Sequence, residues 1–106
     1  MIDITYYRSI NRLVMEGHAG AGAVGQDLVC SAASMLAYTL AANVEQLVDT
    51  GKAREPVISM KEGDTVITCN ALRRCRSVVT LVFDSVCMGF EVLALKYPEN
   101  IAFKIR

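Results

Sequence analysis

The chain has 106 residues, and its eleven basic and eleven acidic side chains cancel to a formal net charge of zero. This length predicts a single domain over residues 1–106, and the balanced charge excludes an overall field that would attract nucleic acid or an anionic membrane. Hydrophobic residues make up 53% of the sequence, which is high for a small soluble monomer, so we expect a second buried face in an oligomer or contact with a membrane.

Cysteine usage and the start of the sequence bear on the cellular compartment. The opening Met1-Ile2-Asp3-Ile4 lacks the basic residues and the long apolar run of a signal peptide. The four cysteines could form two disulfides in a secreted protein; they are Cys30, Cys69, Cys75 and Cys87. Without an export signal, reduced thiols in the cytoplasm are the favoured interpretation.

The N-terminal part of the chain is typical of a β-hairpin. Residues 2–8 begin with the apolar and polar alternation of a strand that has one buried face. Residues 9–12 supply turn chemistry, and residues 13–16 form the returning strand. The Gly/Ala-rich loop that follows, at 19–26, is cheap to move because glycine reaches backbone angles closed to other residues.

A long helix is predicted from Leu28 to about Val48, where apolar residues recur at helical spacing. Asp27 is the candidate N-cap, and Gly51 suits the left-handed position after the helix. No charged residue occurs between Leu28 and Val44, so a membrane span has to be considered. The polar residues within this stretch favour a helix that packs tightly on a sheet.

The second half of the chain predicts another hairpin, a second helix and a last strand. Short β-rich runs at 56–60 and 65–69 are joined by turn residues at 61–64. A second helix is expected over 71–95, with its polar residues on one narrow stripe, and a strand over 101–105. A helix this apolar is covered on most sides, which strengthens the expectation of an oligomer.

These elements predict the order β-β-α-β-β-α-β. Two hairpins and a closing strand would form one largely antiparallel five-stranded sheet with two helices on one face, which is an α+β domain. Cys87, Met60 and Met88 lie among apolar neighbours and are expected in the core.

The most reactive pair of residue types flanks the Gly/Ala-rich loop: His18, which is the sole histidine, and Cys30. A thiol attacks well only as a thiolate. With Asp27 as N-cap, Cys30 would lie in the first helical turn, where the helix dipole and unpaired N–H groups favour an anion and could stabilise an oxyanion. His18 would serve as general base and then as acid for the leaving amine. Asp27 either orients the imidazole or only caps the helix and contacts substrate.

The same residues also have simpler interpretations. A lone histidine beside a loop is more often incidental than catalytic, and a cysteine in a helix is usually a small buried apolar residue. Cys69 and Cys75 could join Cys30 and His18 in a zinc site, but the cysteine spacing lacks the usual gap of two to four residues. We therefore predict no metal and no cofactor.

A cluster of arginines opens the second predicted helix, where the helix dipole disfavours cations. This cluster could bind RNA or an acidic partner; it consists of Arg73, Arg74 and Arg76. A solvated turn is the favoured interpretation.

A longer motif surrounds the histidine and the cysteine. The string Gly17-His18-Ala19, then Gly25-x-Asp27-x-Val29-Cys30, then Ala32-Ala33-Ser34, resembles the signature of the ribosomal-processing cysteine protease family, Prp. Weaker similarity extends over the whole chain, including the opening hairpin and the turn at Gly63. Ser31 departs from the pattern, which has alanine after the cysteine, and the change is small.

The resemblance implies a cytoplasmic homodimer of small α+β subunits that removes an N-terminal extension from large-subunit ribosomal protein number twenty-seven. It implies that Cys30 is the nucleophile and His18 its base, with the loop between them closing over the substrate. Asp27 would be the acidic member of the motif. The remaining motif residues would shape the site; they are Gly17, Gly25 and Ser34.

Two other functions remain open from the sequence. A non-catalytic dimeric factor could bind ribosomal protein or RNA with the same groove and the arginine cluster, and a cysteine hydrolase could act on a different substrate. In an enzyme, Cys30 should react with iodoacetamide much faster than the other three cysteines, and replacement of His18 should slow that reaction.

Overall fold

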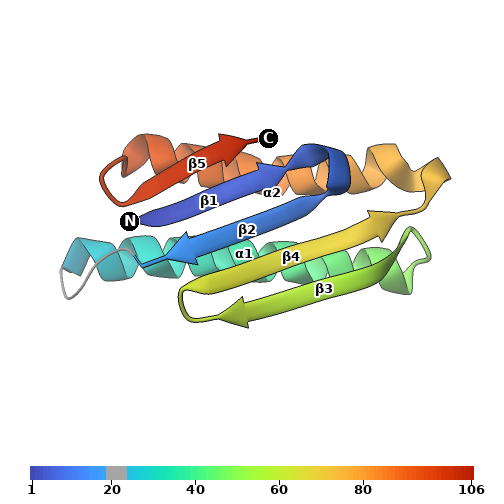
Figure 1. The fold of residues 1–106 in the computed structure, drawn as a ribbon, viewed down its shortest axis with the longest axis horizontal. Coiled ribbons are helices and arrows are strands. Elements are labelled where there is room, and N and C mark those ends of the chain that lie inside the picture. The colour runs from blue at the N-terminus through green and yellow to red at the C-terminus, as the bar shows by residue number, and fades with distance from the viewer. Residues whose placement is uncertain (19–23) are drawn as a thin grey trace.

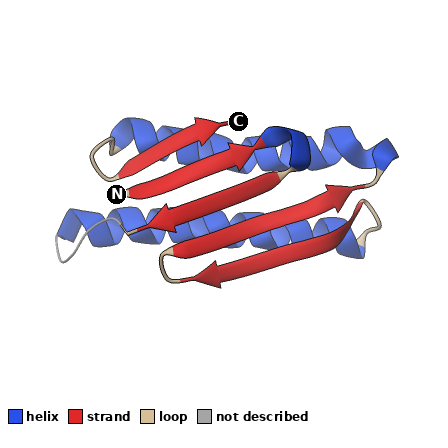
Figure 2. Cartoon of the chain, in the orientation of Figure 1, coloured by secondary structure: helices blue, strands red, loops and turns tan. Residues whose placement is uncertain are grey.

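The structure is a computed structural model that describes residues 1–18 and 24–106, with the side chains of residues 24–27 left out. Five strands and two long helices form two layers, and both helices lie behind the sheet in Figures 1 and 2. In chain order the elements are β1 (Ile2–Tyr7), η1 (Arg8–Ile10, a 3₁₀ helix), β2 (Arg12–Gly17), α1 (Val24–Asp49), β3 (Ala53–Lys61), β4 (Asp64–Ala71), η2 (Arg73–Cys75, also 3₁₀), α2 (Arg76–Lys96) and β5 (Ile101–Ile105).

The sheet is mixed, with strand order β3-β4-β2-β1-β5. All neighbouring strands are antiparallel except β1 and β5, which are parallel. The chain reaches β5 from β4 through α2, which crosses behind the sheet (Figure 1). This crossover places β5 at the edge of the sheet, parallel to β1. The α+β class, the five-stranded and mostly antiparallel sheet and the two helices on one face agree with the prediction.

The core lies between the sheet and the helices. On β1 the side chains of Ile2, Ile4 and Tyr6 are buried, while Asp3 between them is exposed. This alternation follows from the two-residue period of a strand, which directs every second side chain toward the helices. The helices contribute buried side chains along their inner faces, among them Val29, Ala33, Leu40 and Val44 from α1 and Val79, Phe83 and Phe90 from α2.

Two predicted helix starts were wrong. Helix α1 begins at Val24, so Asp27 lies inside the helix and is not its N-cap. One glycine, at position 25, costs a helix only about 1 kcal/mol, which the cooperative extension of the helix offsets. The second helix does not begin at Ala71, because Ala71 pairs with Ala53 as the last residue of β4. Helix α2 begins only at Arg76, after the short 3₁₀ helix η2.

Among the described residues, two segments are long and apolar enough to cross a membrane, Leu28–Asp49 and Arg73–Lys96. This is weak evidence, because core helices pass the same test of length and composition. Both helices pack on the sheet, as Val44 of α1 and Phe83 of α2 are fully buried. This arrangement corresponds to the predicted helix on a sheet.

Candidate active site

His18 directly follows β2, and its backbone is held from two sides. The Gly17 N–H donates a hydrogen bond to the Gly63 carbonyl oxygen at 3.0 Å, which ties the end of β2 to the turn between β3 and β4. The Met1 nitrogen donates to the His18 carbonyl oxygen. A side chain at the end of a paired strand has a rigid support, so the position of His18 depends on the hairpin and not on the loop that follows.

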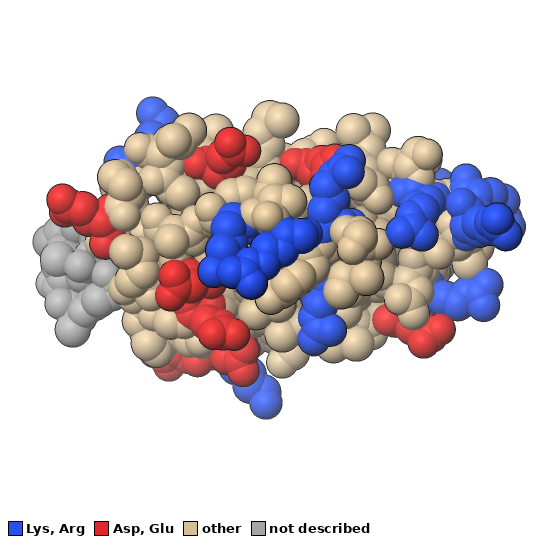
Figure 3. All heavy atoms as spheres, turned by 45° about the horizontal axis from the view of Figure 1, so that its top comes forward, with Lys and Arg blue, Asp and Glu red and all other residues tan. Residues whose placement is uncertain are grey.

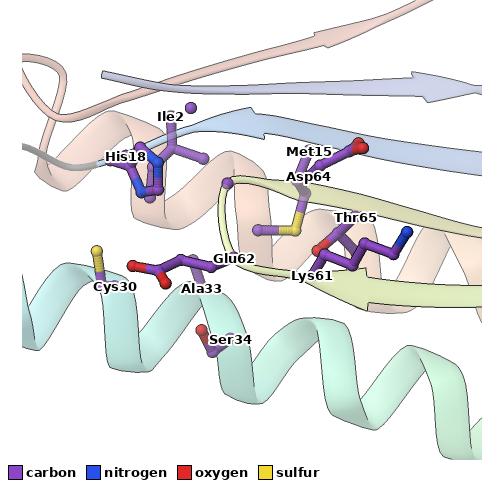
Figure 4. A pocket seen from close by; sticks show the side chains of 12 residues that line it. Ile2, Met15, His18, Cys30, Ala33, Ser34, Lys61, Glu62, Asp64 and Thr65 are labelled. Atoms are coloured by element: carbon purple, nitrogen blue, oxygen red, sulfur yellow. The ribbon is translucent and has the colours of Figure 1, made fainter.

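Cys30 is the seventh residue of α1, counted from Val24. It is half-buried beside the fully buried Val29. Ala33 and Ser34 lie one turn further along the same helix face, because residues three and four apart are neighbours there. In Figure 4 the Cys30 sulfur points away from α1, toward the side on which His18 lies.

These groups line one open pocket of about 260 Å³. Gly17 and His18 enter it from the end of β2, Cys30 and Ser34 from α1, and residues 61–65 from the β3–β4 turn. Four of the predicted site residues, from two separate elements, therefore line the same pocket. The space is sufficient for a side chain of a bound peptide, since a water molecule occupies about 30 Å³.

The other predicted site features fall outside what the structure describes. Gly25 and Asp27 lie in α1, but the side chains of residues 24–27 are not described. The loop at 19–23, which we expected to close over a substrate, is also outside the described residues. The prediction that Cys30 lies in the first helical turn was wrong, because the helix begins at Val24 and Cys30 is its seventh residue. Only the first four N–H groups of a helix lack a partner within the helix, so Cys30 lies beyond them.

The four cysteines differ in their surroundings. All are free thiols, so the two-disulfide alternative is not realised in the structure. Cys69 and Cys87 are buried, and burial raises the pKa of both thiols, to about 12 for Cys87. Cys75 is half-buried on η2, and Cys30 lines the pocket that contains His18. In the described part of the chain, no three His, Cys, Asp or Glu side chains lie close enough to hold a metal.

Sequence reasoning missed the contribution of the β3–β4 turn. Lys61, Glu62, Gly63, Asp64 and Thr65 all line the pocket, although the sequence marked this stretch only as a turn. Figure 4 shows the Glu62 carboxylate extending toward Cys30, with Lys61 and Asp64 extending away. The one signal in the sequence was the glycine in the turn, and nothing local related it to a histidine 45 residues earlier.

Comparisons with known proteins agree with this geometry. A sequence model of the family described as cysteine protease Prp matches residues 1–102. No curated protein matches the chain.

Solved structures share the fold. One is a crystal structure of an essential ribosomal processing protease Prp from S. aureus with a substrate peptide, at TM-score 0.70 and 21% identity over 99% of this chain and 97% of that chain. The same S. aureus protease with a covalently linked product peptide gives a TM-score of 0.69 and 22% identity over the same shares of the two chains. A Streptococcus mutans protein gives 0.68 and 25%, over 98% of this chain and 90% of that chain.

Proposed function

We propose that this chain, which belongs to the cysteine protease Prp family, removes the N-terminal extension from the precursor of large-subunit ribosomal protein number twenty-seven. Its membership makes the chain a cysteine protease, which favours an enzyme over the non-catalytic binding factor. The observation that carries the proposal is the pocket that both the sole histidine and a half-buried thiol line, inside the matched residues 1–102.

In the proposed mechanism, the His18 imidazole takes the proton from the Cys30 thiol. The thiolate attacks the scissile carbonyl carbon, and the carbonyl π electrons move to oxygen. When the tetrahedral intermediate collapses, the peptide C–N bond breaks and the imidazolium protonates the leaving amine. Water then attacks the carbonyl carbon of the resulting thioester while the imidazole takes its proton. The C–S bond breaks, the carboxylic acid product leaves, and the imidazolium returns the proton to the Cys30 sulfur.

The elements that carry His18 and Cys30 hold the backbone of both residues in place. Cys30 is on a long helix and His18 is at the end of a paired strand, so neither depends on a free loop. The described residues include no hydrogen bond between the imidazole and the sulfur. In enzymes without substrate such bonds are often long and tighten only when substrate binds.

The neighbouring structures support a peptide substrate. The S. aureus protease was crystallised with a substrate peptide and with a covalently linked product peptide. Here the pocket is open to solvent, and both a thiol and an imidazole line it. These two groups are sufficient for nucleophilic catalysis of peptide hydrolysis. We propose that a segment of the ribosomal protein precursor occupies it.

We also propose that the protease is cytoplasmic, since free cysteines stay reduced in that compartment. We further propose that it is a homodimer. Helix α2 leaves a largely apolar stripe exposed, with Leu81 at 65%, Met88 at 64% and Leu95 at 76% exposure. These three residues are seven positions apart, which is the spacing of a helix–helix seam. We therefore assign the stripe to contact with a second copy; Val78, Val92 and one polar residue, Ser85, complete it.

The decisive test is cleavage of the organism's own precursor of this ribosomal protein, with product masses measured by mass spectrometry. We expect one cut near the end of the extension with the wild type. Cys30→Ala and His18→Ala should each lose at least about a hundredfold in rate, because each removes a group that reacts in the rate-determining chemistry. Cys75→Ala, which alters a half-buried thiol outside the pocket, should cleave normally.

A folded, reduced wild-type protein that makes no cut would contradict this substrate assignment. Selective alkylation of Cys30 in the same sample would then indicate a cysteine protease with another substrate.

A further inference from the structure

The bare Cα of Gly63 lies against the imidazole of His18. A Cβ built at position 63 would come within 2.7 Å of the His18 Nε2 and 2.8 Å of its Cε1. Such distances are too short for real Cβ contacts, so the turn and the ring cannot both keep their positions if residue 63 has a side chain. The ring atoms that this Cβ would meet lie at the Nε2 edge of the imidazole.

The backbone of the turn has little freedom to retreat. Lys61 pairs with Asp64, so residues 62 and 63 form the tight connection between β3 and β4. Asp64 also pairs with Glu16 on β2, and the Gly63 carbonyl accepts the hydrogen bond from Gly17. The imidazole, by contrast, is the end of a side chain that rotates about two bonds and is exposed to solvent.

We propose that Gly63 is a positioning residue for the His18 imidazole, and that the missing side chain at this position places Nε2 in the pocket with Cys30. This inference rests on the proposed function, in which His18 is the general base. A side chain at position 63 pushes the ring away and leaves the hairpin intact. The β3–β4 turn is thus a third part of the active site, beside the end of β2 and helix α1.

The expected effect is on the chemical step. A general base must lie within hydrogen-bond reach of the proton it removes, and a misplacement of about 1 Å can reduce the rate by about a hundredfold. If the substrate contacts many residues of the pocket, one added methyl group should change KM less than kcat. We therefore expect Gly63→Ala to lower kcat by about 10- to 100-fold.

The chain contains a matched control in Gly51. Gly63 has φ +75° and Gly51 has φ +73°, so alanine at either position is forced into the same left-handed backbone conformation. A Cβ at Gly51, however, meets nothing within 4 Å. Gly51→Ala should therefore lose similar stability and keep the wild-type kcat.

A second readout does not depend on activity. Because His18 is the sole histidine, its imidazole signals in NMR spectra of histidine-labelled protein need no further assignment. Gly63→Ala should shift these signals and slow iodoacetamide alkylation of Cys30, while Gly51→Ala should do neither. Gly63→Asn tests the same point if the alanine variant does not fold, because asparagine tolerates the left-handed region and still has a Cβ.

Wild-type imidazole signals and wild-type kcat in a folded Gly63→Ala or Gly63→Asn protein would overturn the inference. Failure of the proposed function has a different signature, namely full activity in His18→Ala or no cleavage by the wild type. In that case the NMR comparison of the Gly63 and Gly51 variants still decides whether Gly63 positions the ring.

Discussion

Burial separates the four cysteines of this protease into two groups. Cys69 and Cys87 are almost fully buried, and the raised pKa of each keeps its thiol protonated near neutral pH. Cys30 and Cys75 are both half-buried, so exposure alone does not distinguish them. The difference between them is the pocket, because only Cys30 lines it together with His18.

If His18 takes the proton from the Cys30 thiol, as the proposed mechanism requires, iodoacetamide should alkylate Cys30 at least about tenfold faster than Cys75. Mass spectrometry of tryptic peptides after timed labelling measures both rates in one sample. His18→Ala should bring the Cys30 rate down to that of Cys75. Equal rates for these two cysteines in the wild type would count against Cys30 as the nucleophile.

At the scale of the elements, strand β1 and helix α2 are joined by a polar contact at the margin of the core. The Tyr6 hydroxyl donates a hydrogen bond to Asp84 at 2.8 Å, and Arg8 forms an ion pair with the same carboxylate at 3.0 Å. Burial of Tyr6, together with its hydrogen bond to Asp84, raises the pKa of the phenol. The Tyr6 ring also stacks on Phe83, with 6.0 Å between the ring centroids.

Asp84→Ala should lower the free energy of unfolding by about 1–3 kcal/mol, because the buried Tyr6 hydroxyl loses a charged acceptor. Arg8→Ala should have a smaller effect, because the Arg8 side chain is 56% exposed. Urea denaturation at neutral pH measures both variants. A larger loss for Arg8→Ala than for Asp84→Ala would show that the ion pair, and not the tyrosine contact, stabilises this joint.

Acid should weaken the same joint. The hydrogen bond from Arg8 holds the pKa of Asp84 below its ordinary 3.8 in the folded protein. A lowered pKa in the folded state means that this stabilisation is present above the unfolded-state pKa and is lost as the pH falls through the folded-state value. The stability difference between wild type and Asp84→Asn should therefore shrink below about pH 4. A difference that stays constant down to pH 2 would contradict this.

At the scale of the whole molecule, the pocket and the arginine cluster lie at opposite ends of the fold. The register of β2 with β4 pairs Glu16 with Asp64 near the pocket, and Arg12 with Thr68 toward the other end. Arg73 and Arg74 on η2 follow that second end and are exposed, and Figure 3 shows Lys and Arg side chains gathered there. The arginine cluster therefore lies away from the pocket.

The exposed apolar stripe of α2 also belongs to this scale. The prediction that Met88 lies in the core was wrong: its side chain is 64% exposed, so its apolar neighbours in sequence do not cover it in the folded chain. Leu81→Glu or Met88→Glu should convert the proposed dimer into a monomer at micromolar concentration, because a buried unpaired charge is costly. Light scattering measures the mass. Ile10→Glu, at a site of 54% exposure on η1, should stay dimeric. A wild-type monomer would contradict the dimer.

The sequence by itself determined the elements whose signals are local. The alternation in β1 and the helical spacing after Leu28 each lie within one element, and the motif that contains His18 and Cys30 spans only residues 17–34, so all three can be identified without the fold. The α+β class follows from them, because such elements have few ways to cover one another.

Only the tertiary structure decided what depends on pairing between distant segments. Strand β4 continues to Ala71 because β3 offers hydrogen-bond partners there, which no local pattern reveals. Gly63 meets His18 because β2 and β4 are adjacent in the sheet, and Met88 is exposed because the sheet covers only one face of α2. Hydrophobicity and propensity are properties of single residues and their neighbours in sequence, whereas the contacts that position the imidazole come from the order of strands in the sheet.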